Sequence, residues 1–381
     1  MTMRIPLNVA PCSGDELQYI QDAINSGRLA GHNAYSTRCQ SWFEENTGCV
    51  RALMTPSCTA ALEIAAMLID VNTGDEVIMP SFTFVSTANA FALRGAKIVF
   101  VDVDPVTMNI DPEAVESAIT QRTKAVVAVH YAGVPCEMDR LSAIAEHHKL
   151  VLIEDAAQPH LSTFRGKPAG SFGSLAAFSF HETKNLTAGG EGGMLCINDP
   201  RLVQQAEIIR EKGTNRGAFF RGEVDKYTWV GLGSSYLASE LQAAYLYGQL
   251  QNATLLTSRR REIWKKYREG LDDLQKSGRI LLPTPPSESE HNAHMFFLKC
   301  AEITEREALI SHLSEKGICA VFHYVPLHSS PAGKRHGRFH GDDRHTTAES
   351  QRLVRLPMFS SLPDEQVDEV IREIHAFYEA C

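Results

Sequence analysis

Long apolar runs are missing from this sequence. No stretch is long enough to span a bilayer, and the first 20 residues lack the apolar core of a secretion signal. We therefore expect no membrane contact and a cytoplasmic location. Closely spaced cysteine pairs are missing too. The nine cysteines are scattered without a CxxC motif, which fits reduced thiols rather than a disulfide framework.

An excess of positive charge is also absent. The chain has a net charge of −9 and no basic stripe, so general affinity for nucleic acid is not expected. Histidines gather in residues 323–345, but none of the tight paired spacings of zinc motifs occurs there. The sequence therefore predicts no metal site. Internal repeats and low-complexity tracts are lacking as well.

What the sequence does have is an alternation of short apolar runs and helical patterns. Runs that predict strands occupy residues 75–80, 96–104, 124–133, 150–158, 174–180 and 192–199. Helical patterns between them occupy residues 86–94, 111–119 and 138–148. Because the strands are apolar on both faces, they favour an α/β fold with a large, mostly parallel sheet covered by helices on each side.

The length of 381 residues suits two domains, and the later part of the chain changes character. A long helical pattern covers residues 235–275, and a proline-rich stretch follows at 278–294. Beyond it, the pattern predicts a small α+β domain. We therefore expect a large domain at residues 1–250, a small C-terminal domain at 251–381, and a connecting helix near 235–275.

Ligands of parallel sheets bind at the carboxyl ends of the strands, so polar residues at these ends are candidates for a site. Ser57, Cys58 and Thr59 begin an amphipathic helix, whose free N–H groups and dipole can bind a phosphate. Plain N-capping explains the same residues, and a Cys58 thiol activated by the helix dipole is a third interpretation. Ser179 ends another strand and offers a second phosphate ligand.

Aromatic and acidic residues follow other predicted strands. Phe82 and Phe84 come just after one strand, where one could stack on a flat ring or both could belong to the core. Asp155 ends an apolar strand, and its charge needs a partner such as a protonated ring nitrogen, unless it only caps a helix. Gln158 follows three residues later and could donate a hydrogen bond to a ring substituent.

Lys184 lies between the strand at 176–180 and a run of glycines, which allow positive φ or the close approach of a ligand. From this stretch alone, a solvent-exposed loop lysine is the simpler interpretation. In chain order, however, the candidates form a phosphate site, an aromatic residue, a carboxylate and a lysine. Pyridoxal phosphate requires this set, because it needs a lysine for its Schiff base and a carboxylate for its pyridinium nitrogen.

The blocks SCTAALE, PSFTFVSTANA, EDAAQ, SFHETKNLTAGGEGG and ASELQAAY resemble the signatures of the DegT/DnrJ/EryC1/StrS sugar aminotransferases, over essentially the whole chain. This resemblance implies pyridoxal phosphate and the fold type I architecture of aspartate aminotransferase. The blocks EIIREKGTNR, VDKYTW, GSSYL and VFHYVPLH resemble the members that make dTDP-4-amino-4,6-dideoxygalactose for enterobacterial common antigen.

The resemblance also implies roles for single residues. Lys184 would form the Schiff base, and Asp155 would hold the pyridinium nitrogen. The other implied contacts are Gln158 with the ring hydroxyl, Phe84 with the ring face, and Cys58, Thr59, the Ala60 backbone, Ser179 and, across a homodimer, Ser235 around the phosphate. Many members have asparagine in place of Ser235 and glycine in place of Cys58. Family dehydratases have histidine in place of Lys184, so the lysine implies transamination.

The implied reaction transfers an amino group from L-glutamate to the 4-keto carbon of a nucleotide-linked 4-keto-6-deoxy sugar. Expected substrate contacts are Lys212, Arg216, Arg221, His323, Tyr324 and His328. A 3-keto sugar or a UDP-sugar remains open. An amino-acid aminotransferase or a desulfurase would share the lysine and the aspartate. The former usually has a late arginine, and none is identified in the sequence. A non-enzymatic regulator is expected to carry a fused DNA-binding segment, for which the N-terminal stretch leaves no room.

Overall fold

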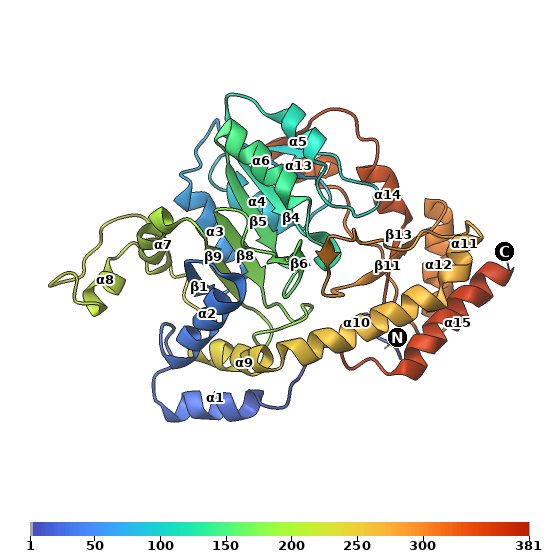
Figure 1. Cartoon of the computed structure of the whole chain (residues 1–381), viewed down its shortest axis with the longest axis horizontal. Helices are drawn as coiled ribbons and strands as arrows, with labels where there is room; N and C mark the ends of the chain where they lie inside the picture. Colours follow the sequence, from blue (N-terminus) through green and yellow to red (C-terminus); the bar gives the residue numbers. More distant parts are fainter. Residues whose placement is uncertain (1–2, 381) are drawn as a thin grey trace.

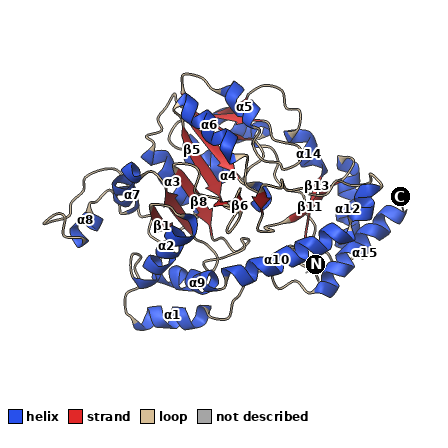
Figure 2. Cartoon of the chain, viewed as in Figure 1, coloured by secondary structure: helices blue, strands red, loops and turns tan. Residues whose placement is uncertain are grey.

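The computed structural model describes residues 3–380 and has an eight-stranded sheet at its centre (Figures 1 and 2). Neighbouring strands pair in parallel, except that β9 runs antiparallel to β8 and β1. In sheet order the strands are β1 (Arg51–Thr55), β9 (Gly193–Ile197), β8 (Leu175–Ser179), β5 (Val151–Ala156), β4 (Thr123–Val129), β2 (Glu76–Pro80), β3 (Lys97–Val101) and β12 (Gly337–Phe339). The six predicted strands are confirmed, with ends that shift by a few residues.

Helices cover both faces of this sheet. On one face the helices are α3 (Cys58–Leu68), α4 (Val85–Ala92) and α7 (Val203–Arg210), and their apolar residues share a core with the strands. On the other face they are α5 (Pro112–Ala118) and α6 (Met138–His148). Both faces of the strands are therefore buried, which is why the strands show continuous apolar runs rather than alternation. The short helix α8 (Arg216–Phe220) extends away from this body (Figure 1).

The helical pattern at 235–275 forms two long helices and the start of a third, short one, rather than a single helix. α9 (Glu240–Gln251) begins at a capping box in which Ser239 accepts from the Gln242 N–H, and Ser235 lies before it in extended chain. The chain is interrupted at Asn252, and α10 (Ala253–Gly270) follows. α9 packs with α1 (Glu16–Asn25) and α2 (Ala34–Thr47) beside the sheet.

The C-terminal residues form a second core around the two-stranded sheet of β11 (Phe296–Lys299) and β13 (Leu353–Leu356). Its helices are α10, α11 (Asp272–Lys276), α12 (Ile303–Glu315), α14 (Thr346–Arg352) and α15 (Asp364–Ala380). The sequence pattern missed one connection, because β12 joins the large sheet at its β3 edge after η3 (Leu327–Ser329) and α13 (Pro331–His336). β6 (Thr163–Phe164), β7 (Lys167–Pro168) and β10 (Ser289–Glu290) form a small separate sheet. None of the helices within residues 3–380 is long and apolar enough to cross a membrane.

Candidate active site

A cavity of about 610 Å³ lies where β1, β2, β5 and β8 end, as expected for a parallel sheet. Its volume is in the range of small-molecule sites. Of the residues predicted from the sequence, it brings together Cys58, Thr59, Phe84, Asp155, Gln158, Ser179, Lys184, His323 and Tyr324. The main chemical groups predicted from separate strand ends therefore share one cavity.

Lys184 lies on the loop between the antiparallel strands β8 and β9, and its N–H donates to the His181 carbonyl at 2.9 Å. The glycines after it have two uses. Gly189 and Gly190 have positive φ values of 78° and 126°, which disfavour other residues. Gly193 lies so close to the Ser57 backbone that a Cβ would overlap it. Burial lowers the pKa of Lys184, so its amine is more readily neutral and nucleophilic.

Asp155 is buried at the end of β5, with 5% of its surface exposed. Its carboxylate accepts from the Thr87 hydroxyl at 2.7 Å and from the Ala157 N–H at 3.2 Å. Burial raises the pKa of Asp155 above its usual value despite these bonds. A cationic partner in the cavity would reverse that cost, and a protonated ring nitrogen is such a partner.

The N-terminus of α3 lies at another side of the cavity. The Ser57 hydroxyl accepts from the Ala60 N–H at 3.1 Å, so Ala60, which we expected to bind phosphate, is already engaged. The N–H groups of Cys58 and Thr59 are the ones that the helix start leaves for an anion. The Thr59 hydroxyl donates to the Ser86 hydroxyl at 2.8 Å, which adds a second hydroxyl to this end.

The Cys58 thiol does not act as an activated nucleophile. It lies 3.5 Å from the Ala177 carbonyl of β8, and burial raises its pKa well above the usual value. The side chain therefore points to the sheet, and the backbone N–H is its useful group.

Of the two aromatic residues after β2, one belongs to the core and the other lines the cavity. Phe82 is fully buried against Tyr131, whereas Phe84 is 56% exposed and lines the cavity. Phe84 is thus free to stack on a ligand ring. Gln158 accepts from the Ala132 N–H at 2.6 Å, and its amide nitrogen lies 3.3 Å from the Tyr324 hydroxyl. Its donor end is the one that faces the cavity.

Other predicted site residues lie outside this cavity. Ser235 is exposed, and the three basic residues of the α7–α8 region, Lys212, Arg216 and Arg221, do not line it. Arg221 pairs with Glu207 at 2.8 Å. His328 instead bonds the Ser81 hydroxyl at 2.7 Å and the Asp343 carboxylate at 3.2 Å, so it is a structural contact. Within residues 3–380, no group of His, Cys, Asp and Glu side chains is arranged to hold a metal ion.

Two lining residues escaped the sequence analysis. Arg355 on β13 and His294 just before β11 come from the C-terminal core and line the cavity beside Lys184. The Arg355 Nε is buried without a hydrogen-bond partner among the described residues. A late arginine is the residue expected to bind a carboxylate, but the residues around Arg355 in the sequence are ordinary strand residues. Its position becomes clear only from the fold, in which Leu353 of β13 packs with Phe82 and Tyr131, which follow β2 and β4.

These groups match pyridoxal phosphate in donor type: an amine, a buried carboxylate, a free aromatic face and a helix N-terminus with hydroxyls. The family model of the DegT/DnrJ/EryC1/StrS aminotransferases matches residues 12–375. The spore coat polysaccharide biosynthesis protein SpsC of Bacillus subtilis is 33% identical, over 97% of this chain and 96% of its own. A protein of Geobacillus stearothermophilus named a pleiotropic regulatory protein is 37% identical, over 84% of this chain and 82% of its own.

Solved structures agree with this assignment. The aminotransferase TlmJ of Streptoalloteichus hindustanus has a TM-score of 0.90 and 28% identity, with 100% of both chains covered. The putative sugar aminotransferase Spr1654 of Streptococcus pneumoniae, solved in a PMP form, has a TM-score of 0.89 and 26% identity, with 99% and 100% covered. The fold is therefore that of the fold type I transferases. The chain belongs to the DegT/DnrJ/EryC1/StrS aminotransferase family, and it is a pyridoxal phosphate-dependent sugar aminotransferase.

Proposed function

We propose that the protein transfers an amino group from L-glutamate to the 4-keto carbon of a nucleotide-linked 4-keto-6-deoxy sugar. The observation that carries this proposal is that Lys184 and Arg355 line one cavity. A transaminase that uses glutamate must hold an amino-acid carboxylate next to its lysine. Arg355 is the only arginine among the residues that line the cavity within residues 3–380, and guanidinium binds carboxylates in a bidentate manner.

In the donor half of the reaction, Arg355 orients glutamate with its amino group toward Lys184. Bound pyridoxal phosphate supplies an electron sink and carries the amino group between the two substrates. Burial lowers the pKa of Lys184, so its neutral amine forms more readily and would take the proton from the α-carbon of glutamate and return it at the cofactor's C4′ atom. Asp155 holds the proton on the ring nitrogen, which keeps the electron sink effective.

In the sugar half, the same lysine moves a proton in the opposite direction, to the sugar carbon that receives the amine. His323 and Tyr324 line the cavity and stack on each other, with ring centroids 3.6 Å apart. Their polar edges and aromatic faces suit a deoxy sugar, which has both hydroxyl groups and an apolar methyl group. We place the sugar ring beside them.

We further propose a homodimer in which each subunit completes the other's site. Apolar side chains lie exposed around α8 and the segment after it: Phe219, Phe220, Tyr227, Trp229, Val230 and Leu232. Such a patch is typical of a buried interface. If a second copy covers it, then Ser235 and the basic residues near α8 approach the partner's cavity, where they would contact the phosphate and the nucleotide.

For the specific substrate, the sequence blocks favour dTDP-4-keto-6-deoxyglucose, and the product would be dTDP-4-amino-4,6-dideoxygalactose for enterobacterial common antigen, made in the cytoplasm. The test is to incubate the protein with pyridoxal phosphate, L-glutamate and this sugar nucleotide, and to analyse the product by NMR. An axial amine at carbon 4 with release of 2-oxoglutarate supports the proposal. Turnover only of a 3-keto sugar or a UDP-sugar would replace it. No turnover of any sugar would favour a regulatory role.

A further inference from the structure

A fully buried pair, His130 after β4 and Glu154 on β5, lies next to the strand ends that form the site. Glu154 accepts four hydrogen bonds: from the N–H groups of Gly170, Phe172 and Gly173 at 2.7, 2.7 and 2.8 Å, and from His130 Nε2 at 2.9 Å. Burial alone would raise the pKa of Glu154, but these bonds lower it. Glu154 is therefore a buried carboxylate.

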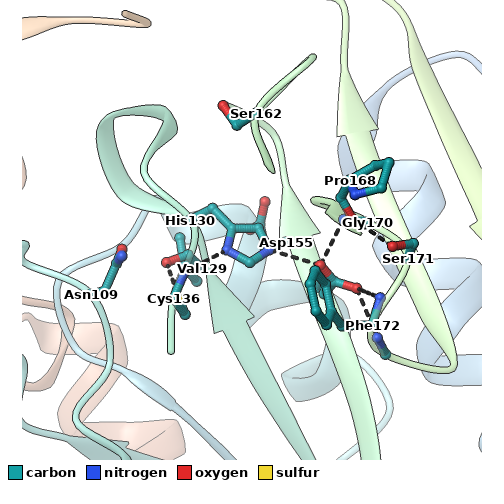
Figure 3. Close-up of polar contacts among 12 residues, drawn as sticks. Asn109, Val129, His130, Cys136, Asp155, Ser162, Pro168, Gly170, Ser171 and Phe172 are labelled. Carbon is teal, nitrogen blue, oxygen red and sulfur yellow. Dashed lines mark hydrogen bonds and ion pairs between the residues drawn. The ribbon is translucent and has the colours of Figure 1, made fainter. Parts of the chain in front are cut away.

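The partner of the second ring nitrogen, Nδ1, determines which nitrogen of the His130 ring carries the hydrogen. His130 Nδ1 accepts from the Cys136 N–H at 3.1 Å (Figure 3). A backbone N–H can only donate, so Nδ1 carries no hydrogen, and the ring hydrogen lies on Nε2 and points to Glu154. Both nitrogens are thus engaged, and the ring holds the backbone of Cys136 at a fixed distance from β5.

The loop closed by this bond has an unusual backbone. Ala132 and Gly133 are successive residues with positive φ values of 57° and 80°. A non-glycine residue in this region costs energy and stays there only where its surroundings hold it. Asn109 adds a clamp, since it accepts from the Tyr131 N–H at 2.8 Å and donates to the Val134 carbonyl at 2.9 Å.

The loop leads directly to the cavity. The Ala132 N–H donates to the Gln158 side-chain oxygen at 2.6 Å. Because an N–H cannot accept, the oxygen of the amide must face Ala132, and the amide nitrogen must face the cavity. The position of one backbone N–H thus makes Gln158 a donor toward any ligand in the cavity.

We propose that His130 and Glu154 are positioning residues that fix the Ala132 loop and thereby present Gln158 as a hydrogen-bond donor to the ring hydroxyl of the cofactor. The inference rests on the placement of Gln158 beside that hydroxyl. The ring oxygen would share a proton with the Lys184 nitrogen at low pH. When that proton leaves, a hydrogen-bond donor stabilises the ring oxygen as an anion. The donor therefore lowers the pH at which the visible absorbance of the bound cofactor changes.

The test is a pH titration of the visible absorbance of the protein loaded with pyridoxal phosphate. In His130→Gln the amide can still donate to Glu154, but Cys136 loses its acceptor. We expect the midpoint to rise by about one pH unit, the effect of losing one hydrogen bond to a charged group. Gln158→Ala should give the same rise, and the double variant should show no further rise, because both changes remove one interaction.

Glu76→Gln is the matched control, since Glu76 is also buried and pairs with Arg122 and Arg338, outside the lining of the cavity. It should cost stability without moving the midpoint. A rise in the control equal to that in His130→Gln, an unchanged midpoint in His130→Gln, or fully additive rises in the double variant would overturn the proposal.

A second variant changes Glu154, the residue that binds His130. In Glu154→Gln an NH2 group replaces one carboxylate oxygen, so either His130 and Gly170 or Phe172 and Gly173 lose their acceptor, and the His130 ring is no longer held as in the wild type. The same rise is expected, again absent in a Gln158→Ala background, so this variant decides the matter if His130→Gln does not fold. These readouts need no sugar, and failure of the proposed substrate would instead appear as inert wild-type protein with a normal titration.

Discussion

Gly193 of β9 and Ser57 before α3 are in backbone contact, and a Cβ on Gly193 would overlap the carbonyl group of Ser57. The strand that follows the lysine loop thus sets the position of the helix start that we assign to the phosphate. The lysine loop and the start of α3 can lie this close only because residue 193 is a glycine, which has no Cβ.

This contact predicts that Gly193→Ala weakens cofactor binding. The added methyl group must push the Ser57 segment away, which displaces the N–H groups of Cys58 and Thr59. We expect the Kd for pyridoxal phosphate, measured by fluorescence, to rise by at least about tenfold, the loss of one charged hydrogen bond. Gly74→Ala is the control, since Gly74 lies outside the lining of the cavity and a Cβ there meets nothing within 4 Å, so its cost is confined to local backbone strain at a φ of 102°. Unchanged binding in Gly193→Ala would disprove the assignment of this helix start to the phosphate.

Lys184→Ala should abolish turnover and remove the lysine adduct that borohydride reduction traps. Because burial lowers the pKa of Lys184 from 10.5, the free amine forms at lower pH than on a surface lysine. When pyridoxal phosphate is added to the cofactor-free protein and borohydride follows, trapping should therefore rise with pH and reach its midpoint below 10.5. Lys265→Ala, at an exposed position, should behave as wild type. A trapped peptide that contained another lysine would refute the assignment.

Asp155→Asn should bind cofactor but lose most of its activity. The amide cannot hold a proton on the ring nitrogen by charge, so we expect turnover to fall by about three orders of magnitude or more, or roughly 4 kcal/mol in the barrier. Asp102→Asn is a matched control, because Asp102 is buried too and binds backbone N–H groups of residues 344–346. Near-normal turnover of Asp155→Asn would reduce Asp155 to a structural cap.

Arg355→Met should separate the two substrates kinetically. Loss of a charged hydrogen-bond pair corresponds to a rise of about 10- to 100-fold in KM for L-glutamate, with little change in KM for the sugar nucleotide. Arg352→Met serves as the comparison, since Arg352 pairs with Glu349 outside the lining of the cavity. If KM for the sugar rises instead, then Arg355 binds the nucleotide diphosphate and the donor carboxylate has another site.

The proposed homodimer predicts complementation between two inactive variants. Lys184→Ala lacks the amine, and Ser235→Arg places a bulky side chain where the partner's phosphate would lie. A mixed dimer has one site with both changes and one with neither, so activity should reappear after subunit exchange. If native mass spectrometry shows exchange and activity does not return, each subunit builds its own site.

Site residues that depend on local sequence could be predicted, whereas those that depend on contacts between distant segments could not. Asp155, Ser179 and Lys184 were placed correctly in one cavity because each lies at or a few residues beyond the end of an apolar strand, and strand ends meet at one edge of a parallel sheet. Local pattern was enough for them. Arg355 was missed because its place depends on how β13 packs against a distant part of the chain, which no local spacing encodes.

The basic residues near α8 show what sequence alone leaves open, and their role in substrate binding stays a prediction. Lys212, Arg216 and Arg221 carry the right charge for an anionic substrate, but charge alone does not fix a position, and the single chain leaves them outside the cavity. The Ala60 N–H was a similar case. It lies at the expected helix start, but it donates its hydrogen bond to the Ser57 hydroxyl. In both cases the sequence contains a suitable group, but its position and hydrogen bonds in the fold determine whether a ligand in the cavity can contact it.

The antiparallel pair β8–β9 has a consequence for turnover. Ser179 and Gly193 are directly paired, so both ends of the lysine loop are fixed to buried strands. If Lys184 forms the Schiff base that the resemblance implies, its amine would stay at high effective concentration after a substrate amine replaced it, because the loop keeps it from diffusing away. Lys184 would then compete with every amine that the cofactor holds. Its return would be a unimolecular event and would help to release the aminated product.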